Sequence, residues 1–250
     1  MNVKLLAYTP DPEKVIATAA KLCYSDSSIE DLQNGLDDEK TRNFIGMLMS
    51  LGHESPIEHV SFTFGIEGIS RACSHQLVRH RIASYSQKSQ RYVNEGGFEY
   101  IIPPSIEKHA YLKGMFEAEM QQIQEKYEWL RNCLATEIAA DEGIDRKAAE
   151  KRANEDARFL LPNACETKIV VTMNVRSLFN FFKHRCCNRA QWEIRAVAME
   201  MWNQCMEIAP TIFKYAGPDC VTKGKCSEGK MTCGHPVNMT YEVEENMGNN

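Results

Sequence analysis

The sequence predicts an α/β (α+β) fold: a single domain over residues 1–217 whose central, mostly antiparallel sheet is flanked by long helices. First, short apolar segments typical of strands occur between much longer segments of helical periodicity. Second, no internal repeat and no linker rich in Pro, Gly or Ser interrupts these residues. Third, 43% hydrophobic and 25% charged residues are ordinary values for a globular chain of 250 residues. Residues 218–250 are polar and rich in Gly and Cys, so we expect an irregular C-terminal tail.

The first expected elements are one strand and two helices. Residues 3–7 are predicted to form a short strand. A helix is expected over residues 11–22, because Asp11 can cap its first turn and Pro12 suits the first helical position. A second helix is predicted over residues 38–51, where the following glycine provides an end.

The middle of the chain is expected to contain a strand, a helix and a loop. Residues 59–66 (HVSFTFGI) alternate like a half-buried strand. Residues 70–80 have a helical pattern, whereas residues 82–92 are polar, rich in Ser and Gln, and predicted to be a loop. The apolar face of the strand would hold Val60, Phe62, Phe64 and Ile66.

The C-terminal half is expected to be mainly helical. Residues 98–102 should form a short strand that ends at Pro103-Pro104. Apolar residues recur near the helical period over residues 105–138, and a shorter helix is predicted over residues 146–159. The last expected elements are a strand over 168–175 (KIVVTMNV), a helix over 177–187 and a long helix over 190–215 that Pro210 would kink.

Cations gather in two segments that contain no acidic residue, residues 68–94 and 167–192. The net charge of −5 argues against a globally basic nucleic-acid binder. Arginine binds phosphate well because its planar fork donates hydrogen bonds in pairs. These segments therefore suggest an anion site, although a solvated basic face is the alternative. Their cations are Arg71, Arg79, Arg81, Lys88 and Arg91, then Lys168, Arg176, Lys183, Arg185 and Arg189.

One of these arginines lies on an apolar helical face, at the fourth position of the set Leu178, Phe181, Phe182 and Arg185. A buried arginine needs an anionic or strongly polar partner. That partner could be a ligand, or the side chain could reach solvent or meet a structural carboxylate such as Glu193. Arg176 and Asn180 share another face, where they could hold a second ligand together.

Metal-binding and nucleotide-loop motifs are absent or weak. The chain has no G-x-G-x-x-G, no Walker loop and no C-x-x-C pair. His53 and His59 in GHESPIEH do not have the H-E-x-x-H spacing. We therefore expect no metal, a prediction that a stoichiometric zinc assay would test. The tail offers four further soft ligands whose spacing matches no standard zinc pattern, Cys220, Cys226, Cys233 and His235.

The cysteines and the hydropathy predict a cytoplasmic protein that does not bind membranes. Ten cysteines in a chain without a signal-peptide pattern are expected to be free thiols. No apolar run approaches the ~18 residues that a membrane helix needs.

Several segments resemble one enzyme family. Residues 79–89 (RHRIASYSQKS) resemble the RHR-x7-S signature of flavin-dependent thymidylate synthases. Residues 52–64 (GHESPIEHVSFTF) are similar to the family's segment before that signature. The C-terminal half is similar in ARFLLP at 157–162, TMNVRSLFNFFKHR at 172–185 and QWEI at 191–194. Because these segments are collinear over roughly residues 1–217, the chain is identified as a member of this family.

The resemblance implies reductive methylation of dUMP to dTMP. It implies 5,10-methylenetetrahydrofolate as carbon donor, NADPH as reductant and FAD as the cofactor that carries the hydride. It further implies a homotetramer with active sites shared between chains, and an α/β fold unlike that of ordinary thymidylate synthases. Nucleic acid and membranes are not expected as partners.

The resemblance also assigns site residues. Arg185 matches the arginine that contacts the uracil ring and favours ionisation at N3, which makes it the expected catalytic residue. Positions matching dUMP contacts are Gln76, Leu77, Val78, Arg79, Gln87, Lys88, Ser89, Gln90, Arg91, Arg158 and Arg185. Positions matching FAD contacts are Ser55, Arg79, His80, Arg81, Gln87, Asn174, Arg176 and Asn180.

The chain departs from the common family pattern at three of its positions. Many members have an acidic residue in place of Gln87, a glycine in place of Gln90 and a histidine near the flavin in place of Arg189. His53 is a further candidate for a folate or flavin contact, because it lies beside Ser55.

The expected mechanism uses no cysteine nucleophile. Cys73 and Cys165 lie near the family segments but in no cysteine motif of ordinary thymidylate synthases. Ser89 is the alternative nucleophile, and no general base is evident beside it in the sequence.

Two rival function classes stay open. A flavin- or nucleotide-binding enzyme with other chemistry would need the same basic segments. An RNA-binding module could use residues 71–91, but the negative net charge and the few nearby aromatic residues, Tyr85 and Tyr92, disfavour it.

Overall fold

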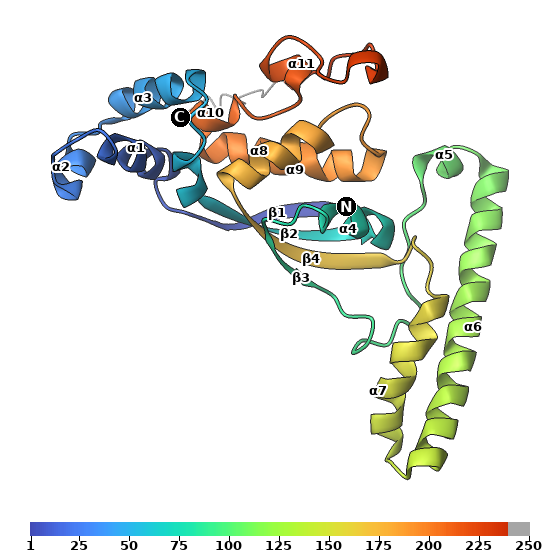
Figure 1. The fold of residues 1–250 in the computed structure, drawn as a ribbon. Coiled ribbons are helices and arrows are strands. Elements are labelled where there is room, and N and C mark those ends of the chain that lie inside the picture. The colour runs from blue at the N-terminus through green and yellow to red at the C-terminus, as the bar shows by residue number, and fades with distance from the viewer. Residues whose placement is uncertain (240–250) are drawn as a thin grey trace, which may run out of the picture. The chain divides into compact units, whose positions relative to one another are not determined.

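The computed structural model describes residues 1–239 of the chain (Figure 1). Four strands form one antiparallel sheet in the order β1-β2-β4-β3. The predicted α+β class, with an antiparallel sheet and long helices, is confirmed. The strands are β1 (Asn2–Tyr8), β2 (Ser61–Ser70), β3 (Ser84–Gln87) and β4 (Glu166–Asn174).

The helices follow most of the predicted segments. Within the described residues they are α1 (Pro12–Leu22), α2 (Ile29–Asn34), α3 (Asp38–Ser50), α4 (Arg71–Leu77), α5 (Pro104–Glu107), α6 (Ala110–Glu142), α7 (Arg146–Ala157), α8 (Val175–Arg185), α9 (Trp192–Ile208), α10 (Pro210–Phe213) and α11 (Asp219–Thr222). Short 3₁₀ turns are η1 (Pro56–His59), η2 (Arg158–Leu160) and η3 (Gly229–Met231). The predicted tail thus contains α11 and η3, and its residues 240–250 lie outside the described part.

Local sequence signals account for several of these elements. The alternating pattern of residues 59–66 is confirmed, because all four residues of its apolar face are buried in or beside β2. α1 begins at Pro12 with Asp11 at the N-cap position, as predicted, but the Asp11 side chain makes no capping hydrogen bond and its backbone is left-handed, with φ 47°. α2 was not predicted, although Ser28 supplies a cap whose Oγ accepts a hydrogen bond from the Asp31 N–H at 3.1 Å.

Two predictions about strands are wrong. Residues 84–87 form β3 within the predicted loop, paired with β4 at the edge of the sheet. A short polar edge strand is stabilised by its partner's backbone, so it has no apolar pattern of its own. Residues 98–102 form no strand in the described structure, where Tyr100 makes only an isolated bridge to Cys165.

Two predicted helices are each divided into two. His109 has φ −118° and ψ 106°, and this extended residue separates α5 from α6. Ala209 has φ −141° and ψ 64° and separates α9 from α10. A residue before proline avoids the helical conformation, so Pro210 ends α9 instead of kinking it. Pro210 then begins α10.

The chain forms two compact units, and their boundary falls within β2 and β4. The first unit comprises Met1–Asn2, Ile66–Arg79 and Tyr85–Val170. The second unit comprises Val3–Gly65, His80–Ser84 and the residues from Val171 onward.

The second unit has an aromatic core. α9 is fixed to β1 by Gln204, whose Oε1 accepts from the Leu5 N–H at 2.6 Å and whose Nε2 donates to the Val3 carbonyl at 2.8 Å. The ring of Phe62 on β2 meets that of Phe213 on α10 edge-on at 5.3 Å. The largest fully buried aromatic side chains of this unit are Phe62, Phe64, Phe181, Phe182 and Phe213.

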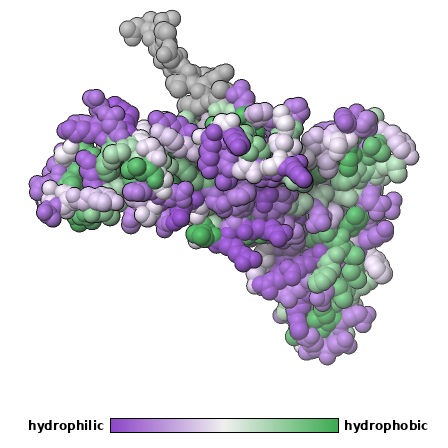
Figure 2. Space-filling model, turned by 45° about the horizontal axis from the view of Figure 1, so that its top comes forward, coloured by the Kyte–Doolittle hydropathy of each residue, from purple (hydrophilic) through white to green (hydrophobic). Residues whose placement is uncertain are grey.

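The first unit contains a helical hairpin of α6 and α7 (Figure 1). Phe98, Met120 and Cys165 form a small buried cluster in this unit. α6 also leaves large apolar side chains in solvent, with Tyr111 75% and Trp129 67% exposed. Figure 2 shows apolar atoms gathered along this hairpin. A contiguous exposed apolar face of this kind is typical of an interaction surface.

Candidate functional site

Four predicted dUMP contacts lie at the end of α4. Gln76 and Leu77 belong to its last turn, and Val78 and Arg79 follow directly. Leu77 is fully buried, whereas Val78 and Arg79 are exposed. The helix is shorter than predicted and starts at a capped end, where Ser70 Oγ accepts from the Cys73 N–H at 3.0 Å.

Gln87 and Lys88 are fixed by side chains of the first unit, Gln87 by two hydrogen bonds and Lys88 by an ion pair. Gln87 Nε2 donates to Ser74 Oγ at 2.9 Å and to Thr167 Oγ1 at 3.2 Å. Lys88 Nζ lies 3.1 Å from each carboxylate oxygen of Glu95, which is only 3% exposed. A partly buried ion pair fixes the backbone between its partners, so it orders the segment that was predicted to bind dUMP.

The remaining residues of that segment are half-buried or exposed. Gln90 Nε2 donates to Cys165 Sγ at 3.7 Å. Ser89 Oγ accepts a hydrogen bond from the Arg91 N–H at 3.3 Å. The Arg91 guanidinium donates to the Tyr92 hydroxyl at 3.1 Å and stays exposed. Hydroxyl, amide and guanidinium donors thus follow one another, which suits a phosphate group.

Glu155 on α7 brings two predicted arginines together. Its carboxylate lies 3.8 Å from Arg91 NH1, and its carbonyl accepts from Arg158 Nε at 3.1 Å. Arg71, a cation of the first acid-free segment that matches no family contact, is half-buried. Burial, together with the positive charge of Arg158, lowers the pKa of Arg71. Two partly desolvated like charges favour a bound anion, so Arg71 joins the candidate anion site. Its only sequence signal was its place in the acid-free segment.

Arg185 and His80 form a second cluster, in the second unit. Arg185 Nε donates to His80 Nε2 at 3.0 Å, and the His80 ring meets Phe181 edge-on at 4.9 Å. Burial and the charges of Arg185 and His184 lower the pKa of His80 from 6.5 to about 4. The ring is therefore neutral at pH 7 and can accept the hydrogen bond that orients the guanidinium. As predicted, Arg185 shares a helix with buried Phe181, and it is itself half-buried.

The lowered pKa of His80 predicts a specific pH dependence of stability. The unfolded chain binds this proton near pH 6.5 and the folded chain only near pH 4, so the free energy of unfolding should fall as the pH drops through this window. We expect thermal denaturation to show a steeper loss of Tm between these pH values in the wild type than in His80→Gln. His109→Gln, which changes an exposed histidine, should retain the wild-type slope. Equal slopes in all three proteins would contradict the proposed neutral ring.

The other predicted FAD residues lie around the start of α8. Asn174 is its N-cap, with Oδ1 accepting from the Ser177 N–H at 2.8 Å. Arg176 forms ion pairs with both Glu54 and Glu58. These carboxylates raise the pKa of Arg176 and balance its charge. Arg81 and Asn180, two further predicted FAD contacts, are exposed to solvent. Ser55 lies directly before η1.

The two cysteines near the family segments are poorly suited to nucleophilic attack. Cys73 is fully buried. Burial and the charge of Glu95 raise the pKa of Cys165 to about 11, so its thiol is protonated at neutral pH.

The predicted residues are divided between the two units. All predicted dUMP contacts except Arg185 lie in the first unit, and all predicted FAD contacts except Arg79 and Gln87 lie in the second. Arg79 and His80, consecutive in the chain, stand on either side of the boundary.

Membrane-spanning helices are not found: none of the helices within residues 1–239 has the length and apolar character to cross a bilayer.

Comparison with known proteins gives a consistent result. Residues 4–211 match the model of a family described as "Thymidylate synthase complementing protein". The chain is 56% identical to a flavin-dependent thymidylate synthase of Clostridium tetani, over 96% of this chain and 95% of the relative. Proteins of the same name from Geobacter sulfurreducens and Pyrococcus horikoshii are 52% and 40% identical. These two matches cover 94% and 99% of this chain, and 94% and 98% of the relatives.

Proposed function

The chain belongs to the family of flavin-dependent thymidylate synthases, and from this premise we propose that it methylates dUMP reductively to dTMP. We propose FAD as the flavin, 5,10-methylenetetrahydrofolate as the carbon donor and NADPH as the reductant. The observation that carries the chemistry is Arg185, a half-buried guanidinium that a neutral histidine orients.

The residues of the second unit fit a flavin nucleotide. Exposed Arg81 and Asn180 offer a cation and an amide. Such donors match the pyrophosphate and the polar ring edge of a flavin dinucleotide. Because Glu54 and Glu58 balance the charge of Arg176, we expect that arginine to position the ligand without neutralising the pyrophosphate. When bound, the flavin supplies the hydride for the reduction.

The nucleotide monophosphate is expected at the anion site of the first unit. Ser89, Gln90 and Arg91 would donate to its phosphate, with Arg158 close to the same segment through Glu155. Arg71 would add positive charge from a partly desolvated position. The Lys88–Glu95 pair holds the segment in place without contributing net charge.

Arg185 is proposed to activate the uracil ring. C5 of uracil is a weak carbon nucleophile, and negative charge at N3 and O2 increases its electron density. A guanidinium that is oriented before the substrate binds stabilises this charge with little reorganisation. His80 accepts a hydrogen bond from Arg185 Nε. This bond sets the orientation of the planar guanidinium, including its NH1 and NH2 groups. On this proposal no protein nucleophile attacks C6.

Replacing Ser89 by alanine tests the absence of a serine nucleophile. We expect Ser89→Ala to retain measurable dTMP formation and to lose mainly dUMP affinity, because the hydroxyl serves as a hydrogen-bond donor. Radiolabelled or chromatographic dTMP assays at saturating dUMP measure this. A well-folded Ser89→Ala protein that still binds dUMP but forms no dTMP would restore serine as the nucleophile.

We also propose that the enzyme is a homotetramer with active sites shared between chains. The exposed apolar side chains of α6 support a subunit interface, because their burial between chains would remove a large apolar area from water.

A flavin-binding and turnover experiment tests the proposed function. The purified protein is mixed with FAD, passed through gel filtration and reduced anaerobically with NADPH, with and without dUMP. Retained flavin that bleaches, and forms dTMP after addition of methylenetetrahydrofolate, is the expected result. Retained flavin whose reduction is independent of dUMP and yields no dTMP would mean a flavoenzyme with another substrate. No retained flavin would contradict the proposed FAD site.

A further inference from the structure

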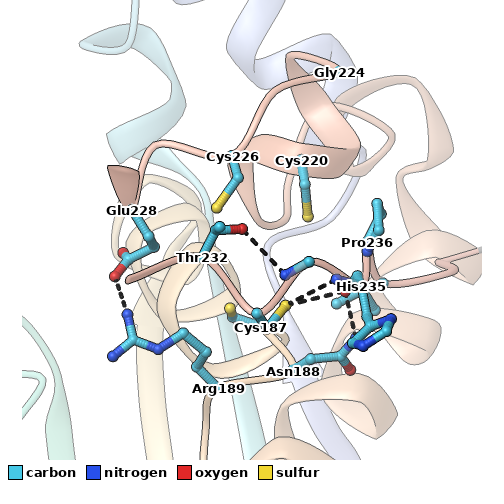
Figure 3. A pocket seen from close by; sticks show the side chains of 13 residues that line it. Cys187, Asn188, Arg189, Cys220, Gly224, Cys226, Glu228, Thr232, His235 and Pro236 are labelled. Carbon is cyan, nitrogen blue, oxygen red and sulfur yellow. Dashed lines mark hydrogen bonds and ion pairs between the residues drawn. The ribbon is translucent and has the colours of Figure 1, made fainter. Parts of the chain in front are cut away.

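Four thiols line one cavity in the second unit. The cavity has a volume of about 160 Å³ and lies between the connection from α8 to α9 and the C-terminal segment that begins with α11. Cys187 comes from the connection, and the other three come from the C-terminal segment. In Figure 3 the side chains of Cys220 and Cys226 point toward the segment that carries Cys187. The four thiols are those of Cys187, Cys220, Cys226 and Cys233, all free and all half-buried.

Polar contacts already join the two sides of this cavity. Asn188 Nδ2 donates to the His235 carbonyl at 2.8 Å, and Arg189 pairs with Glu228 (Figure 3). Arg195 in turn donates to Asn188 Oδ1 at 2.6 Å, which fixes the amide. The thiols therefore belong to one local structure that is connected on both sides.

A tight turn follows Cys233. Gly234 has φ +72°, a left-handed conformation that glycine adopts easily. This turn brings the His235 N–H to 3.4 Å from Cys233 Sγ, and the same sulfur lies 3.2 Å from the His235 carbonyl. Cys233 Sγ is thus held against the backbone of His235, and both residues line the cavity.

We propose that Cys187, Cys220, Cys226 and Cys233 bind one Zn²⁺ ion as a structural site. Four sulfur ligands in tetrahedral geometry, with Zn–S distances of about 2.3 Å, are a common closed zinc site. Binding forms four Zn–S bonds and releases the four thiol protons to solvent, with no change of oxidation state.

The thiols must turn inward to reach this geometry. As the side chains of residues 1–239 stand, no three His, Cys, Asp or Glu groups are close enough to hold a metal. A cysteine Sγ moves on one rotatable bond, so the proposed site requires rotation about these bonds when the metal binds. The spacing of cysteines in the sequence did not indicate this site, because Cys187 lies far from the three tail cysteines in the chain.

The proposed zinc would fasten the C-terminal segment to the end of α8. Cys187 follows Arg185 by two residues, so the metal would limit the motion of the helix end that carries this arginine. Metal binding to the folded state alone raises stability by mass action.

Metal content of the untagged full-length protein is the primary test. Mass spectrometry of the metals should find about one zinc per chain in protein purified without chelator. Reconstitution with Co²⁺ should give the intense visible absorption of tetrahedral cobalt with thiolate charge-transfer bands, which requires no variant. Absence of zinc both as purified and after reconstitution, or a weak octahedral cobalt spectrum, would overturn the proposal.

Matched cysteine variants locate the site. Cys226→Ser and Cys233→Ser should each bind less than about a fifth as much zinc as the wild type and melt at a lower temperature. Cys133→Ser, which changes an exposed cysteine on α6, should keep full zinc and the wild-type Tm. Zinc that is unaffected by Cys226→Ser, or disulfides between these four cysteines in intact-mass and thiol counts of protein purified under reducing conditions, would contradict the zinc site.

Discussion

Replacing Arg185 with alanine is expected to lower kcat/KM for dUMP on the order of 10²–10³-fold, the usual cost of removing an oriented group that stabilises charge in the transition state. The guanidinium is half-buried and fixed by His80, so neither water nor a neighbouring lysine can reproduce its position. Steady-state dTMP formation with varied dUMP measures the loss. A fall in kcat as well as a rise in KM is expected, because the interaction is proposed to strengthen as the ring becomes negative.

Lys183→Ala is the matched control on the same helix. Lys183 pairs with Asp219 at 3.1 Å, and Lys223 remains as a second partner of that carboxylate at 3.2 Å. We expect its kcat/KM to stay within about fivefold of the wild type, since a single partly exposed ion pair contributes little. Equal and small losses in the two variants would remove Arg185 from the catalytic site.

The periodicity of apolar residues was sufficient to predict which side chains share one face of a single strand or helix. The apolar face of β2 and the shared face of Phe181 and Arg185 both follow from side-chain periodicity, and both are confirmed as buried or half-buried. The basic segments also predict an anion site, which stays a prediction. These features need only the order of residues within about ten positions, which a sequence displays directly.

Features that depend on distant residues could not be predicted in this way. His80 lies 105 residues before Arg185, and no local pattern pairs them. β3 depends on β4 as its partner, and its polar sequence is typical of a loop. The break at Ala209 was expected as a kink, because the sequence indicates the effect of Pro210 but not how far the chain turns. The cavity that joins Cys187 to the tail is of the same kind.

The second large effect is expected when Phe181 is replaced. Its side chain belongs to the core and also packs against the ring of His80. Phe181 is fully buried and meets His80 at 4.9 Å and Phe182 at 5.8 Å. Phe181→Ala should lower the free energy of unfolding by about 3–5 kcal/mol, through lost burial and the cavity left behind. That is a large part of the ~5–15 kcal/mol by which folded domains are stable, and chemical denaturation measures it.

The same substitution should change the titration of His80. Burial is the largest cause of the lowered pKa, so opening the site next to the ring should raise the pKa from about 4 toward 6.5. NMR titration of the imidazole in wild type and variant measures the shift. Phe179→Ala is the control, because Phe179 lies on the same helix, is only half-buried and packs on Phe213. It should cost about 1 kcal/mol and leave the His80 pKa unchanged. A stable Phe181→Ala protein with an unshifted His80 would show that Arg185, rather than burial, keeps the ring neutral.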